Sequence, residues 1–182
     1  MDQIHDRLHR AADIVEIQQL INRIARSSDR RDWATMVSCF HPGAIDNHGF
    51  FEGPIEDFAR WTSDRHTDIT LSQHHISNII VDFRDEATAA VESYCLVWQS
   101  LSQSDGDSSS VPAVIATSRY VDVVTRTNGG PWKVAERTVV FEASKTTTVA
   151  RATAQERSSQ VVGTRDTSDC LWTVRGKLGI SS

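Results

Sequence analysis

The N-terminal part of the chain repeats its apolar residues at helical spacing. From Arg7 to Ser27 they recur every three or four positions, which predicts an amphipathic helix with one buried stripe. That stripe consists of Leu8, Ala11, Ile14, Ile17, Leu20, Ile21 and Ile24. Ser27-Ser28-Asp29 interrupts the pattern, and a second short helix is predicted from Asp32, ending at Pro42-Gly43. Gly53-Pro54 opens a third helix, because proline suits a first helical turn.

After His66 the pattern changes to long runs rich in Val, Ile, Thr, Tyr and Trp, which are typical of strands. The predicted strands are Ile76 to Phe83, Ala87 to Leu101, Ala113 to Arg126 and Trp132 to Ala143. Asp85-Glu86, Ser102 to Ser110 and Asn128 to Pro131 separate them as turns and a loop. Long strands joined in series predict a strongly curved antiparallel sheet. Helices followed by such a sheet predict an α+β fold, with three helices packed into the concave face.

The last part of the chain has a different texture. Residues 145–182 are polar and rich in Thr, Ser and Arg. We therefore predict one domain over residues 1–144, and a tail over 145–182 that covers either the pocket or a subunit interface. A length of 182 residues fits a single hydrophobic core.

Composition excludes several classes of function. The net charge of −5 and the lack of a run of Lys or Arg argue against binding to nucleic acid or to a membrane surface. Cys39, Cys95 and Cys170 are odd in number and widely spaced, which indicates a reducing compartment. The polar N-terminus predicts no signal peptide, and no apolar run is long enough for a membrane span. We expect a cytoplasmic protein.

The candidate chemistry lies at Asp29 and His74. Successive strand residues point to opposite faces, so only one of His74 and His75 can enter the concave interior. The same alternation makes them poor joint ligands, and the chain has no HExxH motif, so no metal is expected. Asp29 lies where the first helix gives way to the second. A carboxylate there can orient an imidazole on the first strand and stabilise its positive charge.

Each candidate also has a structural interpretation. Asp29 or Asp32 can cap the second helix, and His74 can be a half-buried structural histidine. His48 lies in the loop Asn47-His48-Gly49, where it can face either solvent or substrate. Side chains on strands usually pack in the core or pair across the sheet. The candidate substrate contacts, all open to this objection, are His48, Trp33, Tyr94, Trp98, Arg119, Tyr120 and Arg126.

Taken together, a succession of short motifs resembles the SnoaL-like branch of the nuclear transport factor 2-like superfamily. Each motif alone is unspecific, but their order and spacing agree from about residue 10 to 142. The N-terminal motifs are Ile17 to Arg23, Ser28 to Trp33 and Phe40 to Ala44. The later motifs are His74 to Asn78, Arg119 to Asp122 and Gly130 to Arg137.

This resemblance implies a cone formed by one curved sheet and three helices around a deep pocket. The branch includes scytalone dehydratase, bile acid 7α-dehydratase and hexachlorocyclohexane dehydrochlorinase, which are cofactor-free lyases with an Asp–His pair. By motif, that pair falls on Asp29 and His74, and an arginine of the dehydrochlorinase matches Arg126 most nearly. A tyrosine that several dehydratases carry five residues before the aspartate is Ile24 here. Relatives are commonly trimers or dimers, so a homo-oligomer is expected.

Three hypotheses follow. The first is a cofactor-free lyase that uses His74 as base on a hydrophobic, ring-bearing, hydroxylated small molecule and releases water, a halide or a carbonyl fragment. The second is an isomerase or cyclase acting on a steroid-like or polyketide-like ketone, which needs an oxyanion donor instead of a leaving-group acid. The third is a non-catalytic binding or assembly module, since a fold does not fix a function.

Overall fold

The computed structural model describes residues 2–102, 110–150 and 153–180. Its helices are α1 (Asp2–Asp29), α2 (Trp33–Ser38), α3 (Ile55–Arg65), α4 (Ala154–Ser159) and α5 (Cys170–Lys177). Its strands are β1 (Phe40–Asn47), β2 (Glu52–Pro54), β3 (Ile69–Phe83), β4 (Thr88–Leu101), β5 (Ser110–Thr125) and β6 (Lys133–Ala150). Most of the loop expected at Ser102 to Ser110 lies outside the described residues.

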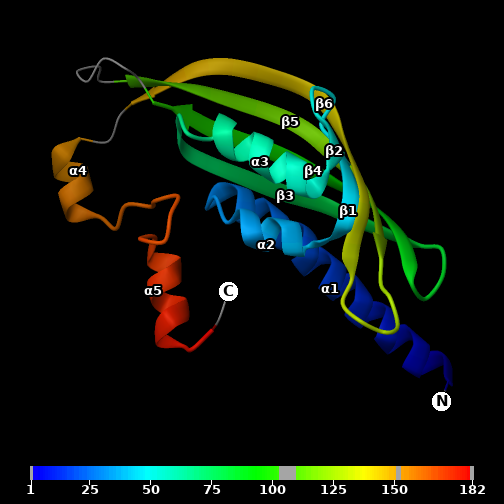
Figure 1. Ribbon diagram of the computed structural model, residues 1–182. Coiled ribbons are helices and arrows are strands. Elements are labelled where there is room, and N and C mark those ends of the chain that lie inside the picture. Colours follow the sequence, from blue (N-terminus) through cyan, green and yellow to red (C-terminus); the bar gives the residue numbers. More distant parts are fainter. Residues whose placement is uncertain (1, 103–109, 151–152, 181–182) are drawn as a thin grey trace.

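The strands form one curved, open sheet in the order β2-β1-β6-β5-β4-β3. The sheet arches over α1, α2 and α3, which lie on its concave side (Figure 1). The predicted α+β class is confirmed, and β3 to β6 form the expected antiparallel series.

The sequence prediction was wrong about β1 and β2, which it assigned to no strand. Pro42-Gly43 does not end a helix but lies within β1, where Gly43 adopts a left-handed φ of 71° beside a register shift. β1 pairs with β6 in parallel, so the sheet is not purely antiparallel. Helix α2 ends earlier, at Ser38. Because β1 lies in the sheet, Ala44 and Asp46 are buried on its concave side, whereas Ile45 between them is exposed.

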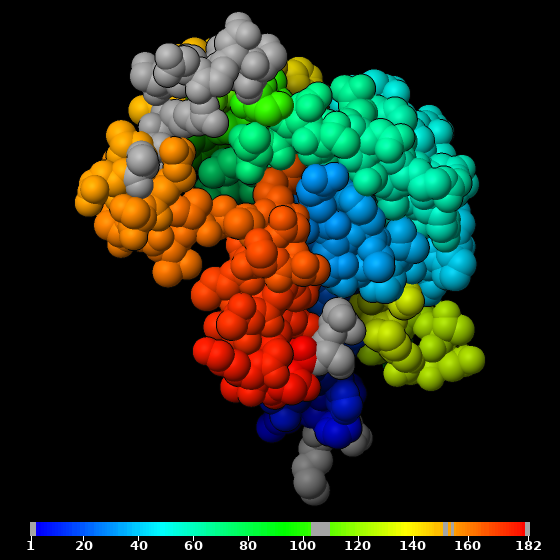
Figure 2. Space-filling view, turned by 60° about the vertical axis from the view of Figure 1, so that its left-hand side comes forward, coloured from blue at the N-terminus to red at the C-terminus, as the bar shows by residue number. Residues whose placement is uncertain are grey.

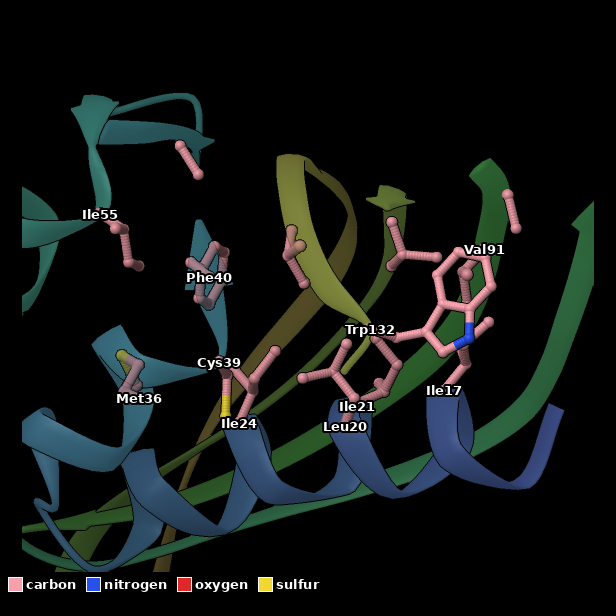
Figure 3. Packing of buried hydrophobic residues seen from close by; sticks show 14 of the residues in the cluster. Ile17, Leu20, Ile21, Ile24, Met36, Cys39, Phe40, Ile55, Val91 and Trp132 are labelled. Atoms are coloured by element: carbon pink, nitrogen blue, oxygen red, sulfur yellow. The ribbon is translucent and has the colours of Figure 1, made fainter. Parts of the chain in front are cut away.

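The core is packed between α1 and the sheet. Ile17, Leu20, Ile21 and Ile24 are buried, and they point toward Phe40, Val91 and Trp132 (Figure 3). The first turns of α1 extend past the sheet, so Leu8 is 64% exposed although the pattern placed it in the stripe. Asp13 is buried there instead, and it accepts a hydrogen bond from the indole nitrogen of Trp132 at 3.0 Å.

A bulge in β3 changes which of its residues face inward, so that one strand both lines the pocket and packs in the core. The register of β3 against β4 shifts between Ser77 and Ile80, and Asn78 has a φ of 48°, which asparagine tolerates better than most residues. Before the bulge, the even-numbered residues Ser72 and His74 face inward, and after it Ile79 and Val81 pack against the core. Strand β3 begins at Ile69, so His74 lies inside the strand and not at its start.

The tail forms an arm that contains two short helices, neither of them predicted. Strand β6 continues through residue 144, the expected boundary, to Ala150. After α4, the chain returns to α1 and α2, and the red arm lies against the light blue segment that follows α1 (Figure 2). Arg30 approaches Asp169 at 3.6 Å, and the Asp169 side chain caps α5 by accepting from the Leu171 amide. Residues near 165 therefore contact the end of α1.

Two further features concern the state of the cysteines and the length of the helices. Cys39 and Cys95 are buried and Cys170 is exposed, and all three are free thiols. Within residues 2–102, 110–150 and 153–180, no helix is both long and apolar enough to cross a membrane.

Helix α1 offers a matched test of the core. We expect Ile21→Ala to lower the free energy of unfolding by about 2–5 kcal/mol, since Ile21 is 1% exposed and its truncation leaves a cavity. Val15→Ala, on the same helix but 58% exposed, should change it by less than about 0.5 kcal/mol. Urea denaturation of both variants measures the difference. Equal effects would contradict this packing.

Candidate functional site

The Asp29 carboxylate joins the end of α1 to β3. Its Oδ1 accepts from the Ser72 hydroxyl at 2.9 Å and from His74 Nδ1 at 2.6 Å. Its Oδ2 accepts from the His74 backbone amide at 2.9 Å. Because a deprotonated carboxylate only accepts, His74 carries its proton on Nδ1 and leaves Nε2 available as a base. The two residues paired by the sequence analysis do meet.

Local sequence explains why Asp29 is free for this contact. The turn after α1 places Arg31 at a φ of 55°, and the Asp32 amide donates to the Ser27 carbonyl at 2.8 Å. Asp32 then caps α2 by accepting from the Thr35 amide at 3.1 Å. The capping role that the sequence left open between the two aspartates therefore belongs to Asp32.

His74 opens onto a cavity of about 400 Å³ between the sheet and α3. Its wall is largely apolar and aromatic, and His48, His74 and Tyr120 are among its polar groups. The lining residues are Ser28, His48, Phe50, Phe58, Trp61, Thr62, Arg65, His66, Ile69, His74, Val97, Gln99, Leu101, Ala116, Ser118, Tyr120, Val139 and Phe141. A second, inner space of about 40 Å³ is lined by residues that include His48, His74, Tyr120, Asp46 and Arg137.

A second carboxylate–imidazole pair lies at the same cavity. His48 Nδ1 and Asp46 Oδ1 form a short hydrogen bond, and Asp46 is only 1% exposed. His48 was predicted as a candidate substrate contact, whereas Asp46 was not. The sequence did contain the information needed, because residues two apart along an extended chain share a face, but β1 had not been predicted.

Buried polar groups surround the inner space. Arg137 donates to both carboxylate oxygens of Asp122, at 2.7 Å each, and its guanidinium lies 4.4 Å from the centre of the Tyr120 ring. Burial raises the pKa of the Tyr120 phenol well above its usual value, so it stays protonated at neutral pH. Arg137, Asp122 and Asp46 are site residues that sequence reasoning missed.

Arg165 fixes the corner that holds Asp29. Its guanidinium donates to three backbone carbonyls, those of Ser28 (2.9 Å), Asp29 (3.0 Å) and Ile69 (2.8 Å). It also contacts His66 Nδ1 at 2.9 Å, where the imidazole must be the acceptor. Burial lowers the pKa of Arg165 to about 10, so it remains charged at neutral pH. The arm thus ties the end of α1 to the start of β3.

Three predicted substrate contacts lie on the outer face of the sheet. In β4, Val97 and Gln99 line the cavity, so Tyr94 and Trp98 alternate to the other side. In β5, Ser118 and Tyr120 face inward, which sends Arg119 outward to Glu92 (2.6 Å) and Glu142 (2.8 Å). The predicted placement of Tyr94, Trp98 and Arg119 was wrong, because sequence alone did not fix which alternate residues face inward.

The outer face is partly apolar. Tyr94, Leu96, Val121 and Val123 are each between 39% and 45% exposed. Such a surface suits the homo-oligomer expected from the sequence, and that assembly stays a prediction.

Two more predicted contacts lie elsewhere. Arg126 pairs with Asp13 at 2.6 Å, donates to the Glu86 carbonyl at 2.8 Å and covers Trp132, so it serves the far end of the sheet. Trp33 packs edge-on against His66, with ring centroids 5.4 Å apart, and lines a separate cleft beside Arg165. Of the predicted substrate contacts, His48 and Tyr120 line the cavity.

No metal site emerges in the part of the chain that the structure describes, since no three His, Cys, Asp or Glu side chains converge there.

Comparisons with known proteins agree with this architecture. Residues 9–138 match the family model of the SnoaL-like domain. Among curated proteins, none is significantly similar to this chain in sequence.

Several solved structures share the fold. A presumed scytalone dehydratase from Novosphingobium aromaticivorans has a TM-score of 0.67 and 19% identity, covering 79% of this chain and 93% of its own. A type 2 hexachlorocyclohexane dehydrochlorinase has a TM-score of 0.68 and 16% identity, covering 81% and 97%. A Mycobacterium tuberculosis protein of unknown function covers 92% of both chains, with a TM-score of 0.59 and 16% identity. At such identities the likeness concerns the fold.

The His66–Arg165 contact makes stability depend on pH. Burial, followed by the Arg165 charge, lowers the pKa of His66 from 6.5 to about 4. The folded state keeps His66 neutral, whereas the unfolded chain takes up a proton below pH 6.5. Stability is therefore complete above pH 6.5 and declines as the pH falls toward 4.

We expect wild-type protein to lose about 2–3 kcal/mol of unfolding free energy from this group between pH 7.5 and 4.5. His66→Gln, which cannot titrate, should lack that part of the loss. Urea denaturation of both proteins across this pH range isolates it, because the other titrating groups are shared. Parallel pH profiles would contradict the assignment.

Proposed function

This chain belongs to the SnoaL-like family, and we propose that it is a lyase whose His74 removes a proton from a hydrophobic, hydroxylated ring compound. The observation that supports this most strongly is the 2.6 Å hydrogen bond between Asp29 and His74 at the cavity wall. An imidazole oriented by a carboxylate, here one whose side chain is 13% exposed, is a common way to place a general base.

The proposed step uses the free nitrogen of His74. Nε2 takes a proton from carbon, and Asp29 stabilises the imidazolium that results. The Ser72 hydroxyl and the His74 amide hold the carboxylate in place throughout. A base positioned in this way contributes about 10²–10⁴-fold in rate.

The cavity wall supports the substrate class. Phe50, Phe58, Trp61, Val139 and Phe141 supply apolar and aromatic surface that favours a ring system over a charged metabolite. A volume of about 400 Å³ lies within the range of small-molecule sites. His48 and Tyr120 interrupt this surface as hydrogen-bonding partners for an oxygen substituent.

A β-hydroxy ketone fits these features. The carbonyl acidifies the adjacent C–H bond, whose electron pair forms the new double bond as the C–O bond to the hydroxyl breaks. The hydroxyl leaves with one proton as water, so no redox change occurs. The base and the leaving group must act on neighbouring carbon atoms.

Tyr120 favours a second candidate, an isomerase acting on a ring ketone. A buried phenol that stays protonated can donate a hydrogen bond to an enolate oxygen, while His74 moves a proton between two carbon atoms. This alternative conserves the mass of the substrate, whereas elimination does not.

The lyase proposal is tested with 3-hydroxy-1-tetralone, whose dehydration gives fluorescent 1-naphthol. We expect Asp29→Asn and His74→Gln each to lower kcat/KM by about 10²–10⁴-fold, because each removes part of the base. His75→Gln is the matched control, since His75 is exposed and not among the cavity-lining residues. It should retain wild-type activity.

Three outcomes would count against the proposal. Turnover of the tetralone by His74→Gln at the wild-type rate would exclude His74 as the base. Conversion of androst-5-ene-3,17-dione to an isomer of equal mass, with no reaction of the tetralone, would favour the isomerase. A protein that binds both probes and converts neither would support the non-catalytic module.

A further inference from the structure

The second carboxylate–imidazole pair is rigidly built. Asp46 and His48 are two residues apart at the end of β1, and the chain turns immediately afterwards at Gly49, which has a φ of 77°. The His48 amide donates to the Phe51 carbonyl at 2.8 Å, which closes the turn toward β2. The His48 ring stacks on Phe58, with centroids 4.4 Å apart and planes inclined by 16°. With Nδ1 bonded to Asp46, Nε2 is the nitrogen left for a ligand.

Both imidazoles serve the same space. His48 and His74 line the main cavity, and both also line its small inner neighbour. They come from strands at opposite ends of the strand order, with β1 beside one edge and β3 at the other. The curvature of the sheet therefore brings two imidazoles to one substrate-sized cavity from different directions.

The carboxylate that holds His48 is buried near a second carboxylate and a guanidinium. Asp46, Asp122 and Arg137 are between 1% and 3% exposed, so two carboxylates share one guanidinium away from water. Arg137 donates two hydrogen bonds, each 2.7 Å long, to Asp122. That leaves the negative charge of Asp46 to be balanced. A buried charge is costly unless it is paired, and an imidazolium at His48 would pair it.

The charges around His74 differ. Asp29 already accepts from the Ser72 hydroxyl and the His74 amide, and the Arg165 guanidinium lies behind it on the Asp29 carbonyl. The Asp29 carboxylate therefore has two hydrogen-bond donors besides the His74 ring. Two pairs of the same chemistry thus stand in different surroundings at one cavity, and an elimination needs one group as base and another as acid.

We propose that His48, held by Asp46, is the general acid that protonates the departing hydroxyl. This inference rests on the proposed lyase function and deepens it. His74 Nε2 gains the proton from carbon, the C–H electron pair becomes the double bond, and the C–O bond breaks. The imidazolium of His48 gives its Nε2 proton to that oxygen, which leaves as water. Proton exchange with solvent then restores a neutral His74 and a protonated His48.

Leaving-group dependence tests the assignment. Hydroxide is a strong base that needs a proton to depart, whereas chloride departs without one. We expect His48→Gln to lower kcat/KM for 3-hydroxy-1-tetralone by about 10²-fold or more, and that for 3-chloro-1-tetralone by less than about threefold. Rates are corrected for uncatalysed elimination, and His75→Gln again serves as the control.

The same pair of substrates separates this proposal from the one it rests on. His74→Gln should slow both eliminations. If it slows neither, His74 is not the base and the proposed mechanism fails, whatever His48 does. If His74→Gln slows both but His48→Gln also slows both equally, or slows neither, the base is retained and His48 is not the acid.

Asp46→Asn provides a second variant should His48→Gln fold poorly. It keeps the shape of the side chain but removes its charge, and Arg137 still has Asp122 as its partner. We expect the loss to fall selectively on the hydroxyl substrate, because a neutral amide cannot stabilise the imidazolium. An equal loss on both substrates, with an unchanged circular dichroism spectrum and Tm, would overturn the proposal.

Discussion

The site depends on one carboxylate that bridges a helix end and a strand. Asp29 is the last residue of α1, yet each of its oxygens is bonded to β3, through Ser72, the His74 amide and the His74 ring. These three hydrogen bonds fix the position of the strand, the orientation of the imidazole and its tautomer together. A charged acceptor with several donors is a strong and directional link. The cavity has a defined wall here because this link holds two elements that are distant in sequence.

The rest of the site depends on how the charge of each carboxylate is balanced by its neighbours. The chain places Asp29, Asp46 and Asp122 behind the inward-facing side chains, and each meets a different partner: an imidazole with two further donors, an imidazole alone, and a guanidinium. Since electrostatic interactions are stronger in a low-dielectric interior than in water, the partner of each carboxylate determines how its charge is balanced. Chemical diversity at this cavity arises from the partners of the acidic groups more than from the groups themselves.

The sequence was informative where periodicity and chain order determine structure. The spacing of Ile17, Leu20, Ile21 and Ile24 predicted the buried face of α1, and the long apolar runs predicted the curved sheet. Alternation required that His74 and His75 point to opposite faces, and the family pattern selected His74 as the partner of Asp29. Those two residues meet as expected.

Other features could not be obtained in that way. Tyr94, Trp98 and Arg119 were assigned to the interior because nothing in a strand's sequence states which alternate residues face inward, especially when register shifts occur. Asp46 was not predicted as a site residue, because Pro42-Gly43 was interpreted as the end of a helix and strand β1 was not predicted. Arg165 carries no local signal at all, since its three carbonyl partners belong to segments that only folding brings together.

The arm contributes a residue that supports the site from outside the part of the chain that matches the family. The match to the family model ends at residue 138, but the guanidinium that binds the carbonyls behind the base comes from residue 165. Asp29 and His74 thus lie within the matched region, whereas a residue outside it holds the backbone behind them. A substitution in the arm can therefore alter the position of the base without altering any residue of the cavity wall.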